Sequence, residues 1–173
     1  MRRYLLSEIT ALLKAPKPRK EQEIEVLLTD SRSLTFPQRT LFVALVTERG
    51  DGHRYIGELY ERGVRAFVVS KKVERAYPEA TMIEVPDTLQ ALQTLAKWRR
   101  EALQMPLVAI TGSNGKTTTK ELLYQLLSPH LSVGRSPRSY NSQIGVPLSL
   151  WGLEEGEQLA LIEAGISKPG EMA

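Results

Sequence analysis

The segment 108–119 restricts the fold of this chain more than any other part of the sequence. It reads VAITGSNGKTTT, an apolar strand that runs into a glycine-rich loop and then into a helix that starts near Lys116. Glycines let the backbone curl so that successive N–H groups can face phosphate oxygens, and the helix adds the positive end of its dipole. We therefore predict a phosphate-binding loop between a strand and a helix.

Two side chains of this loop point to nucleoside triphosphate chemistry. The ammonium of Lys116 suits the β- and γ-phosphates of ATP, and the hydroxyl of Thr117 suits a bound Mg²⁺. The segment departs from the usual eight-position pattern, because Ile110 stands where that pattern has its first glycine and the glycine is displaced to Gly112. The alternative is a glycine-rich turn before an ordinary helix. The preceding strand, the following helix and Asn114 disfavour that alternative.

Strands alternate with helices along the chain, which indicates an α/β fold. Apolar periodicity predicts helices over 5–13, 55–62, 88–103 and 116–127, and strands over 23–28, 40–46, 65–70, 81–85, 107–111, 131–134 and 158–164. Gly63 and Asp87 are placed to cap the ends of two of these helices. Residues 144–151 form a short apolar segment with Pro147 near its start. We predict a small N-terminal α/β domain over 1–86, a connecting helix over 87–105, and the first part of a mostly parallel-sheet domain over 106–173.

Composition excludes several classes of protein. The 173 residues include no cysteine, which excludes disulfides, thiolate metal sites and a cysteine nucleophile. Six basic residues and one acid fall within residues 1–20, and the remainder is slightly acidic. The chain therefore lacks the broad basic surface of a nucleic-acid binder. No apolar run approaches the ~18 residues of a membrane span, and no signal-peptide pattern is present, so we expect a cytoplasmic protein.

Several segments jointly resemble the Mur ligases, the amino-acid-adding enzymes of peptidoglycan precursor synthesis. They are the loop 111–118, the segment 140–147 (YNSQIGVP), the segment 162–165 with 170–172, and the blocks 29–32, 40–45 and 51–53. Folylpolyglutamate synthetases share a related loop, whereas 140–147 resembles the branch that adds D-alanyl-D-alanine. The amino-acid sequence of 163–172 also resembles that of family members that carry a fused alanine racemase.

The resemblance implies a role for each part of the chain. The N-terminal domain would bind the UDP moiety of UDP-N-acetylmuramoyl-tripeptide, and the following domain would be a P-loop ATPase domain. Candidate UDP contacts are Ser31, Arg32 and His53. Candidate ATP contacts are Thr111, Gly112, Ser113, Asn114, Gly115, Lys116, Thr117, Thr118 and Asn141. Thr117 and Glu163 would hold Mg²⁺, and Lys116 and Glu163 are the candidate catalytic residues.

The implied activity is an ATP-dependent ligation that adds D-alanyl-D-alanine to the tripeptide through an acyl phosphate. The family's ATPase domain continues beyond the equivalent of residue 173, so we expect a fragment without ligase turnover. We also expect self-association, because an incomplete sheet leaves strand edges unpaired. The alternatives are another Mur or folylpolyglutamate-type ligase, or a non-catalytic module that binds a UDP-sugar or nucleotide.

Each candidate residue also has an ordinary structural explanation. Glu163 could be a solvated acid at the end of a strand, and Asn141 could serve a turn. The Asp-Ser-Arg segment that ends at Arg32 could be a turn with a solvated arginine, and His53 could cap the helix that follows it. The three-dimensional arrangement distinguishes these explanations.

Overall fold

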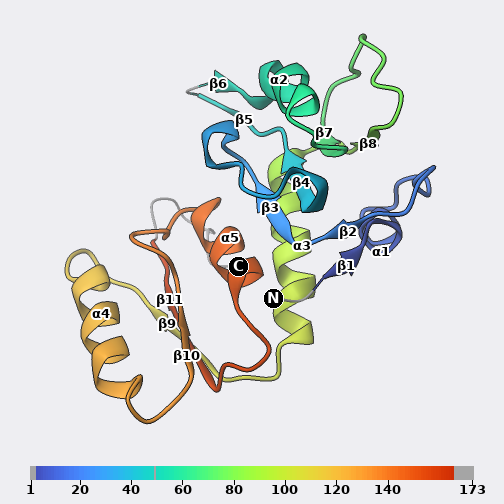
Figure 1. The fold of residues 1–173 in the computed structure, drawn as a ribbon. Coiled ribbons are helices and arrows are strands. Elements are labelled where there is room, and N and C mark those ends of the chain that lie inside the picture. The colour runs from blue at the N-terminus through green and yellow to red at the C-terminus, as the bar shows by residue number, and fades with distance from the viewer. Residues whose placement is uncertain (1–2, 49, 166–173) are drawn as a thin grey trace. The chain divides into compact units, whose positions relative to one another are not determined.

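The structure is a computed structural model that describes residues 3–48 and 50–165. The chain divides into two compact units between Leu95 and Ala96, within the helix α3 (Thr88–Ala102). Each unit combines a parallel sheet with helices, which confirms the predicted α/β fold class (Figure 1). Within the described residues, no helix is both long and apolar enough to cross a membrane. The predicted domain boundaries stay a prediction.

The first unit contains a four-stranded sheet in the order β3-β4-β7-β8, with every pair parallel. Its strands are β3 (Val26–Leu28), β4 (Thr40–Val43), β7 (Ala66–Val69) and β8 (Thr81–Glu84). The two central strands are buried along their whole length, as their continuous apolar runs require. The remaining elements are β1 (Tyr4–Leu5), α1 (Leu6–Leu12), β2 (Glu23–Ile24), β5 (Val46–Thr47), β6 (Gly50–Asp51), α2 (Ile56–Glu61) and the 3-10 turns η1 (Ser31–Ser33), η2 (Pro37–Arg39) and η3 (Gly52–Tyr55).

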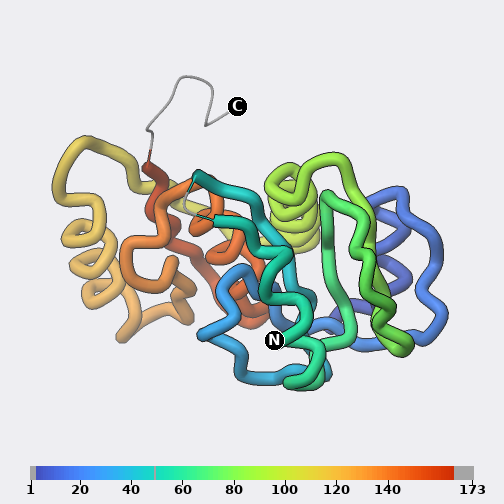
Figure 2. Tube along the Cα trace, turned by 90° about the horizontal axis from the view of Figure 1, so that it is seen from above, coloured from blue at the N-terminus to red at the C-terminus, as the bar shows by residue number. Residues whose placement is uncertain are grey.

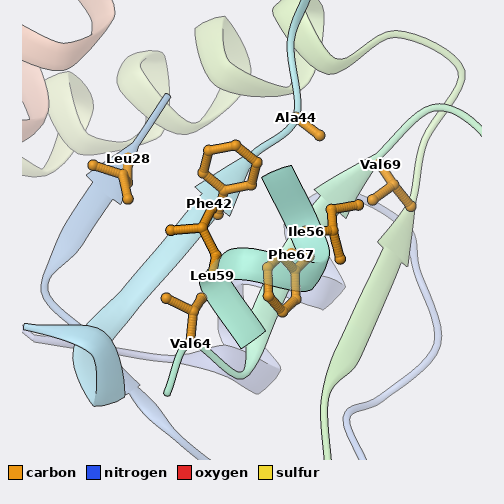
Figure 3. Close-up of a cluster of buried hydrophobic side chains, with 8 residues drawn as sticks. All are labelled: Leu28, Phe42, Ala44, Ile56, Leu59, Val64, Phe67 and Val69. Carbon is orange, nitrogen blue, oxygen red and sulfur yellow. The ribbon is translucent and has the colours of Figure 1, made fainter. Parts of the chain in front are cut away.

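Helix α2 packs on this sheet through a cluster of eight buried side chains (Figure 3). The rings of Phe42 and Phe67, from neighbouring strands, meet edge to face with centroids 6.3 Å apart. This arrangement is favourable because the positive edge of one ring faces the negative face of the other. The other members are Leu28, Ala44, Ile56, Leu59, Val64 and Val69.

Both predicted helix caps are present. Gly63 has φ +98°, which a residue with a side chain rarely adopts, and its N–H donates to the carbonyl of Tyr60 just after α2 ends. At the start of α3, Asp87 Oδ1 accepts the backbone N–H groups of Leu89 (2.7 Å) and Gln90 (3.1 Å).

The first predicted strand of this unit forms two shorter strands in the structure. The predicted strand 23–28 is interrupted at Glu25, whose N–H donates to the carbonyl of Arg39. As a result β2 pairs antiparallel with β1, whereas β3 pairs parallel with β4. Residue-level patterns do not encode these changes of partner, because partner choice depends on tertiary contacts.

The second unit has a three-stranded parallel sheet in the order β10-β11-β9. Its elements are β9 (Leu107–Ile110), α4 (Lys116–Leu127), β10 (Val133–Arg135), α5 (Gly145–Gly152) and β11 (Leu159–Glu163). Helices α4 and α5 lie on opposite sides of this sheet (Figure 1), and the yellow and orange coil of α4 lies beside the red trace of β11 in Figure 2. Ala160 and Ile162 pack with Val146 and Leu150 of α5.

Helix α5 was predicted only as an apolar segment. It begins at Gly145, whose N–H donates to Ser142 Oγ at 3.1 Å. Pro147 therefore falls in the first turn, where backbone N–H groups have no partner within the helix and a proline is tolerated.

Truncating Leu59 tests the core of the first unit. Leu59 is fully buried, so Leu59→Ala should lower the free energy of unfolding by about 2–5 kcal/mol through lost burial and a residual cavity. Val46→Ala is the control, because that side chain is 51% exposed. Urea unfolding of both variants measures the difference, and equal effects would contradict the described core.

Candidate nucleotide and metal site

The carboxyl ends of the three strands in the second unit lie at one edge of its sheet. Strand β9 ends at Ile110, immediately before the glycine-rich loop, and β11 ends at Glu163. The register pairs these two residues, and the N–H of Ala164 donates to the carbonyl of Ile110 at 2.9 Å. Strand β10 ends at Arg135, before the loop that carries Asn141. Open parallel sheets bind their ligands at this edge.

The glycine-rich loop has the backbone that its composition predicts. Gly112 and Gly115 have φ of +142° and +78°, and residues 111–115 are exposed. The ammonium of Lys116 donates to the carbonyl of Gly112 at 2.6 Å and lies 3.4 Å from that of Ser113. The loop therefore curls around the lysine ammonium, close to the N-terminus of α4.

Glu163 is the centre of the site, and its side chain is only 1% exposed. One carboxylate oxygen, Oε2, accepts the hydroxyl of Thr117 at 2.8 Å. The other, Oε1, accepts the side-chain amide of Asn141 at 2.7 Å. The structure thus brings together three of the predicted residues from α4, from the loop after β10 and from β11. It also replaces the solvated-acid explanation of Glu163 with a buried carboxylate that accepts one hydrogen bond at each oxygen.

Two further residues complete this site and were not predicted. Lys120 is fully buried, with its Nζ 3.8 Å from Glu163 Oε2 and 2.8 Å from the carbonyl of Ser136. The hydroxyl of Ser136 accepts the backbone N–H of Glu163 at 2.7 Å. A helix lysine is usually solvated, so the sequence did not single it out. A usable signal was its spacing, because residues three and four apart share a helix face, as Thr117 and Lys116 do with Lys120.

The close approach of the Asn141 backbone explains why residue 165 is a glycine. Its N–H donates to the carbonyl of Asn141 at 2.7 Å, and a Cβ on it would lie 2.9 Å from that oxygen. Real Cβ atoms essentially never approach a backbone oxygen so closely. Glycine at this position therefore lets the loop after β10 lie directly against the end of β11.

The donor set suits Mg²⁺. Within residues 3–48 and 50–165 no group of three or more acidic, histidine or cysteine residues is placed to hold a metal. Mg²⁺ is commonly held by one or two carboxylates together with phosphate oxygens and water, so a dense protein cage is not required. Thr117 and Glu163 offer hard oxygen ligands beside the phosphate loop, and the residues present fit this ion.

The candidate uridine residues Ser31 and Arg32 form a tight turn in the first unit. Asp30 accepts the N–H of Arg32 at 3.1 Å and pairs with its guanidinium at 2.6 Å. This hydrogen-bonded ion pair lowers the pKa of Asp30. The side chain of Arg32 is 87% exposed, whereas Ser31 is buried. The turn is the structural alternative that the sequence left open, and its exposed guanidinium remains accessible to a ligand.

His53 belongs to a different network in the same unit. Its Nε2 accepts the backbone N–H of Ser70 at 3.0 Å, so the ring proton is on Nδ1, which donates to Asp51 at 2.6 Å. Asp51 also accepts the N–H of His53 and pairs with Lys71, and the lysine hydrogen bond is the main cause that lowers the pKa of Asp51. Both ring nitrogens are thus engaged with neighbouring groups. The helix-capping explanation is wrong, because the 3-10 turn η3 is capped by Asp51 and α2 begins without a side-chain cap.

Part of the resemblance lies beyond the described residues. The segment 170–172, and most of the segment 163–172 that resembles the racemase-fused members, fall in residues 166–173.

The fold and the site together define a parallel α/β protein with a phosphate loop. The chain belongs to the Mur ligase family. Residues 110–173 match the Mur ligase middle domain, and residues 23–100 match the model described as the Mur ligase family, catalytic domain.

Curated relatives narrow the comparison to one branch of that family. The UDP-N-acetylmuramoyl-tripeptide–D-alanyl-D-alanine ligase of Bacillus subtilis is 37% identical over 156 residues, covering 90% of this chain and 34% of the relative. The Escherichia coli enzyme of the same name is 34% identical over 168 residues, covering 97% and 36%. The chain therefore spans about a third of the length of the curated relatives it matches.

Solved structures of ligases from the same branch also resemble this chain. A crystal structure of MurF from Acinetobacter baumannii superposes with a TM-score of 0.86 at 30% identity, covering 98% of this chain and 37% of that one. MurF ligase from Thermotoga maritima, in complex with ADP, superposes with a TM-score of 0.73 at 31% identity, covering 86% and 34%.

The Asp51 network gives a pH-dependent prediction. Because the pKa of Asp51 is lowered in the folded state, its contribution to stability is present above the unfolded value near 4 and is lost as the pH falls through the folded value. Asp51→Asn should lower the free energy of unfolding by about 1–2 kcal/mol at pH 7, allowing for the exposure of Lys71. Urea unfolding between pH 7 and pH 3 should show this difference shrinking below pH 4, and a difference that stays constant contradicts it.

Gly165→Ala tests the close approach of Asn141. The added methyl group must push the carbonyl of Asn141 away, and the hydrogen bond from Asn141 to Glu163 should weaken. We expect a shift of the Asn141 side-chain amide signals in ¹⁵N-resolved NMR spectra. Gly156→Ala is a matched control, because a Cβ there meets nothing within 4 Å. Unchanged Asn141 signals in Gly165→Ala would show that the contact does not position this side chain.

Proposed function

We propose that the second unit binds Mg·ATP, and that the ligase to which these residues belong adds D-alanyl-D-alanine to UDP-N-acetylmuramoyl-tripeptide. The observation that carries this proposal is the convergence of Thr117 and Asn141 on the buried carboxylate of Glu163. That carboxylate lies at the end of the strand paired in register with the strand leading into the phosphate loop.

In this proposal some residues of the site bind phosphate and others bind the metal ion. The loop amides and the Lys116 ammonium neutralise phosphate charge, which is the main requirement for phosphoryl transfer. Thr117 and Glu163 supply oxygen ligands to Mg²⁺, while Asn141 holds the Glu163 carboxylate in orientation. The γ-phosphoryl group passes from ATP to a carboxylate oxygen of the tripeptide, which forms an acyl phosphate and releases ADP. The amine of D-alanyl-D-alanine then attacks the acyl carbon, forming the amide and releasing phosphate.

Two lines of comparison support the choice of substrates. Relatives of 34–37% identity carry the name of the D-alanyl-D-alanine-adding ligase, which favours that enzyme over a folylpolyglutamate-type ligase. The Thermotoga maritima neighbour was solved with ADP, which supports an adenine nucleotide at the phosphate loop. For the first unit we propose binding of the UDP moiety near Ser31 and the exposed Arg32.

The competing function is a module that binds the UDP-sugar without ATP. Separate calorimetric titrations of this chain with Mg·ATP and with UDP-N-acetylmuramoyl-tripeptide distinguish the two. The first proposal requires both ligands to bind, whereas the module binds only the UDP ligand.

Substitutions in the site test the ATP proposal directly. Lys116→Met removes the loop ammonium and Glu163→Gln removes the carboxylate charge at nearly constant shape, so each should weaken Mg·ATP binding by about tenfold or more. Glu163→Gln should act only when Mg²⁺ is present, because its loss is the loss of a metal ligand. Lys97→Met is the control, since Lys97 is exposed on α3. Equal affinities in all four chains would refute the assignment.

A further inference from the structure

We propose that Lys120 is a positioning residue, which fixes the loop after β10 and thereby sets where Asn141 and Glu163 meet a nucleotide-bound metal. The inference rests on the proposed Mg·ATP function of the same site. It goes beyond that function because Lys120 donates to the loop after β10 and approaches Glu163, and it is not among the candidate ligands of the nucleotide or the metal.

The burial of Lys120 is the first reason. Its side chain is completely buried, and lysine is rarely so unless its ammonium is paired. An ammonium has three N–H donors and no acceptor, so it can link several acceptors at one point. Here it donates to the carbonyls of Ser136 and Arg138 and lies 3.8 Å from Glu163 Oε2.

The backbone of the linked loop is the second reason. Arg138 has φ +50°, a conformation that residues other than glycine adopt uncommonly. Its carbonyl is one of the two that Lys120 holds. Three residues further on, Asn141 donates to Glu163 and accepts the N–H of Gly165. The ammonium therefore secures an unfavourable turn immediately before a site residue.

The charge around Glu163 is the third reason. The carboxylate receives hydrogen bonds from two neutral groups, Thr117 and Asn141, and among the described residues Lys120 is the cation within 4 Å of it. Glu121 also lies 3.4 Å from the same ammonium and is paired with Arg135. Lys120 thus supplies positive charge to a buried carboxylate from the side of α4, at 3.8 Å from the oxygen that accepts the Thr117 hydroxyl.

A common helix links these roles. Lys116, Thr117 and Lys120 lie within the first two turns of α4, so one rigid element carries the phosphate-binding ammonium, a metal ligand and the ammonium that holds the opposing loop. We infer that removing Lys120 loosens residues 136–141 relative to α4 while leaving the pairing of β9 with β11 in place.

Hydrogen exchange and calorimetry on the full 173-residue chain test this inference. Lys120→Met keeps the length and apolar volume of the side chain but removes the charge and the donors. The amides of Glu163 and Gly165, which bond to Ser136 Oγ and to the Asn141 carbonyl, should exchange about tenfold faster. The amide of Ala160, which bonds to the carbonyl of Pro106 near the start of β11, should not change. Mg·ATP affinity should fall about tenfold, and Lys120→Arg, which keeps the charge, should recover most of it.

The outcomes separate this inference from the proposed function. Failure of the unchanged chain to bind Mg·ATP would contradict the proposed function. The exchange rates are measured without nucleotide, so they would still test whether Lys120 positions the loop after β10. Unchanged exchange and affinity in a folded Lys120→Met chain would overturn the positioning role. A uniform rise in exchange, Ala160 included, would overturn it too, since that indicates general destabilisation. Lys120→Gln, which is shorter and neutral, takes the place of Lys120→Met with the same expectations if that variant does not fold.

Discussion

The register between β9 and β11 is the constraint on which the rest of the site depends. Pairing Ile110 with Glu163 puts the start of the phosphate loop beside the acidic side chain. Successive residues of β11 face opposite sides of the sheet, so Ala160 and Ile162 pack towards α5 while Glu163 faces Thr117 and Lys120 of α4. A shift of one residue would turn the carboxylate towards the apolar contacts of α5 and bury it unpaired.

A buried carboxylate is costly unless it is hydrogen-bonded or paired, and Glu163 meets that requirement with groups from α4 and from the loop after β10. Thr117, Asn141 and Lys120 each contact it, and Ser136 accepts its backbone N–H. This arrangement keeps the Glu163 carboxylate in a fixed orientation, as the proposed role of a metal ligand requires. Phosphoryl transfer depends on such preorganised charge more than on covalent participation of the protein.

Much of this structure was predictable where local chemistry decides it. The strand–loop–helix over 107–127, the caps at Gly63 and Asp87, and the fold class follow from apolar periodicity, backbone preference and capping. The interruption at Glu25 and the helix α5 were not predicted, because strand partners and a tolerated first-turn proline depend on tertiary context. Lys120 was not predicted because its spacing places it on the helix face of Lys116 and Thr117 but does not show that this face is buried.

The most direct test of this account locates a bound metal on the chain. Mn²⁺ takes the same oxygen ligands as Mg²⁺ and broadens nearby NMR signals. On titration of the ¹⁵N-labelled chain with Mn·ATP, the amide signals of Gly115, Thr117 and Glu163 should lose intensity first. Those of Leu127, at the C-terminal end of α4, and of Val133, at the start of β10, should keep theirs longest. Uniform broadening, or earlier loss at Leu127 and Val133, would contradict a metal–nucleotide site at the carboxyl ends of these strands.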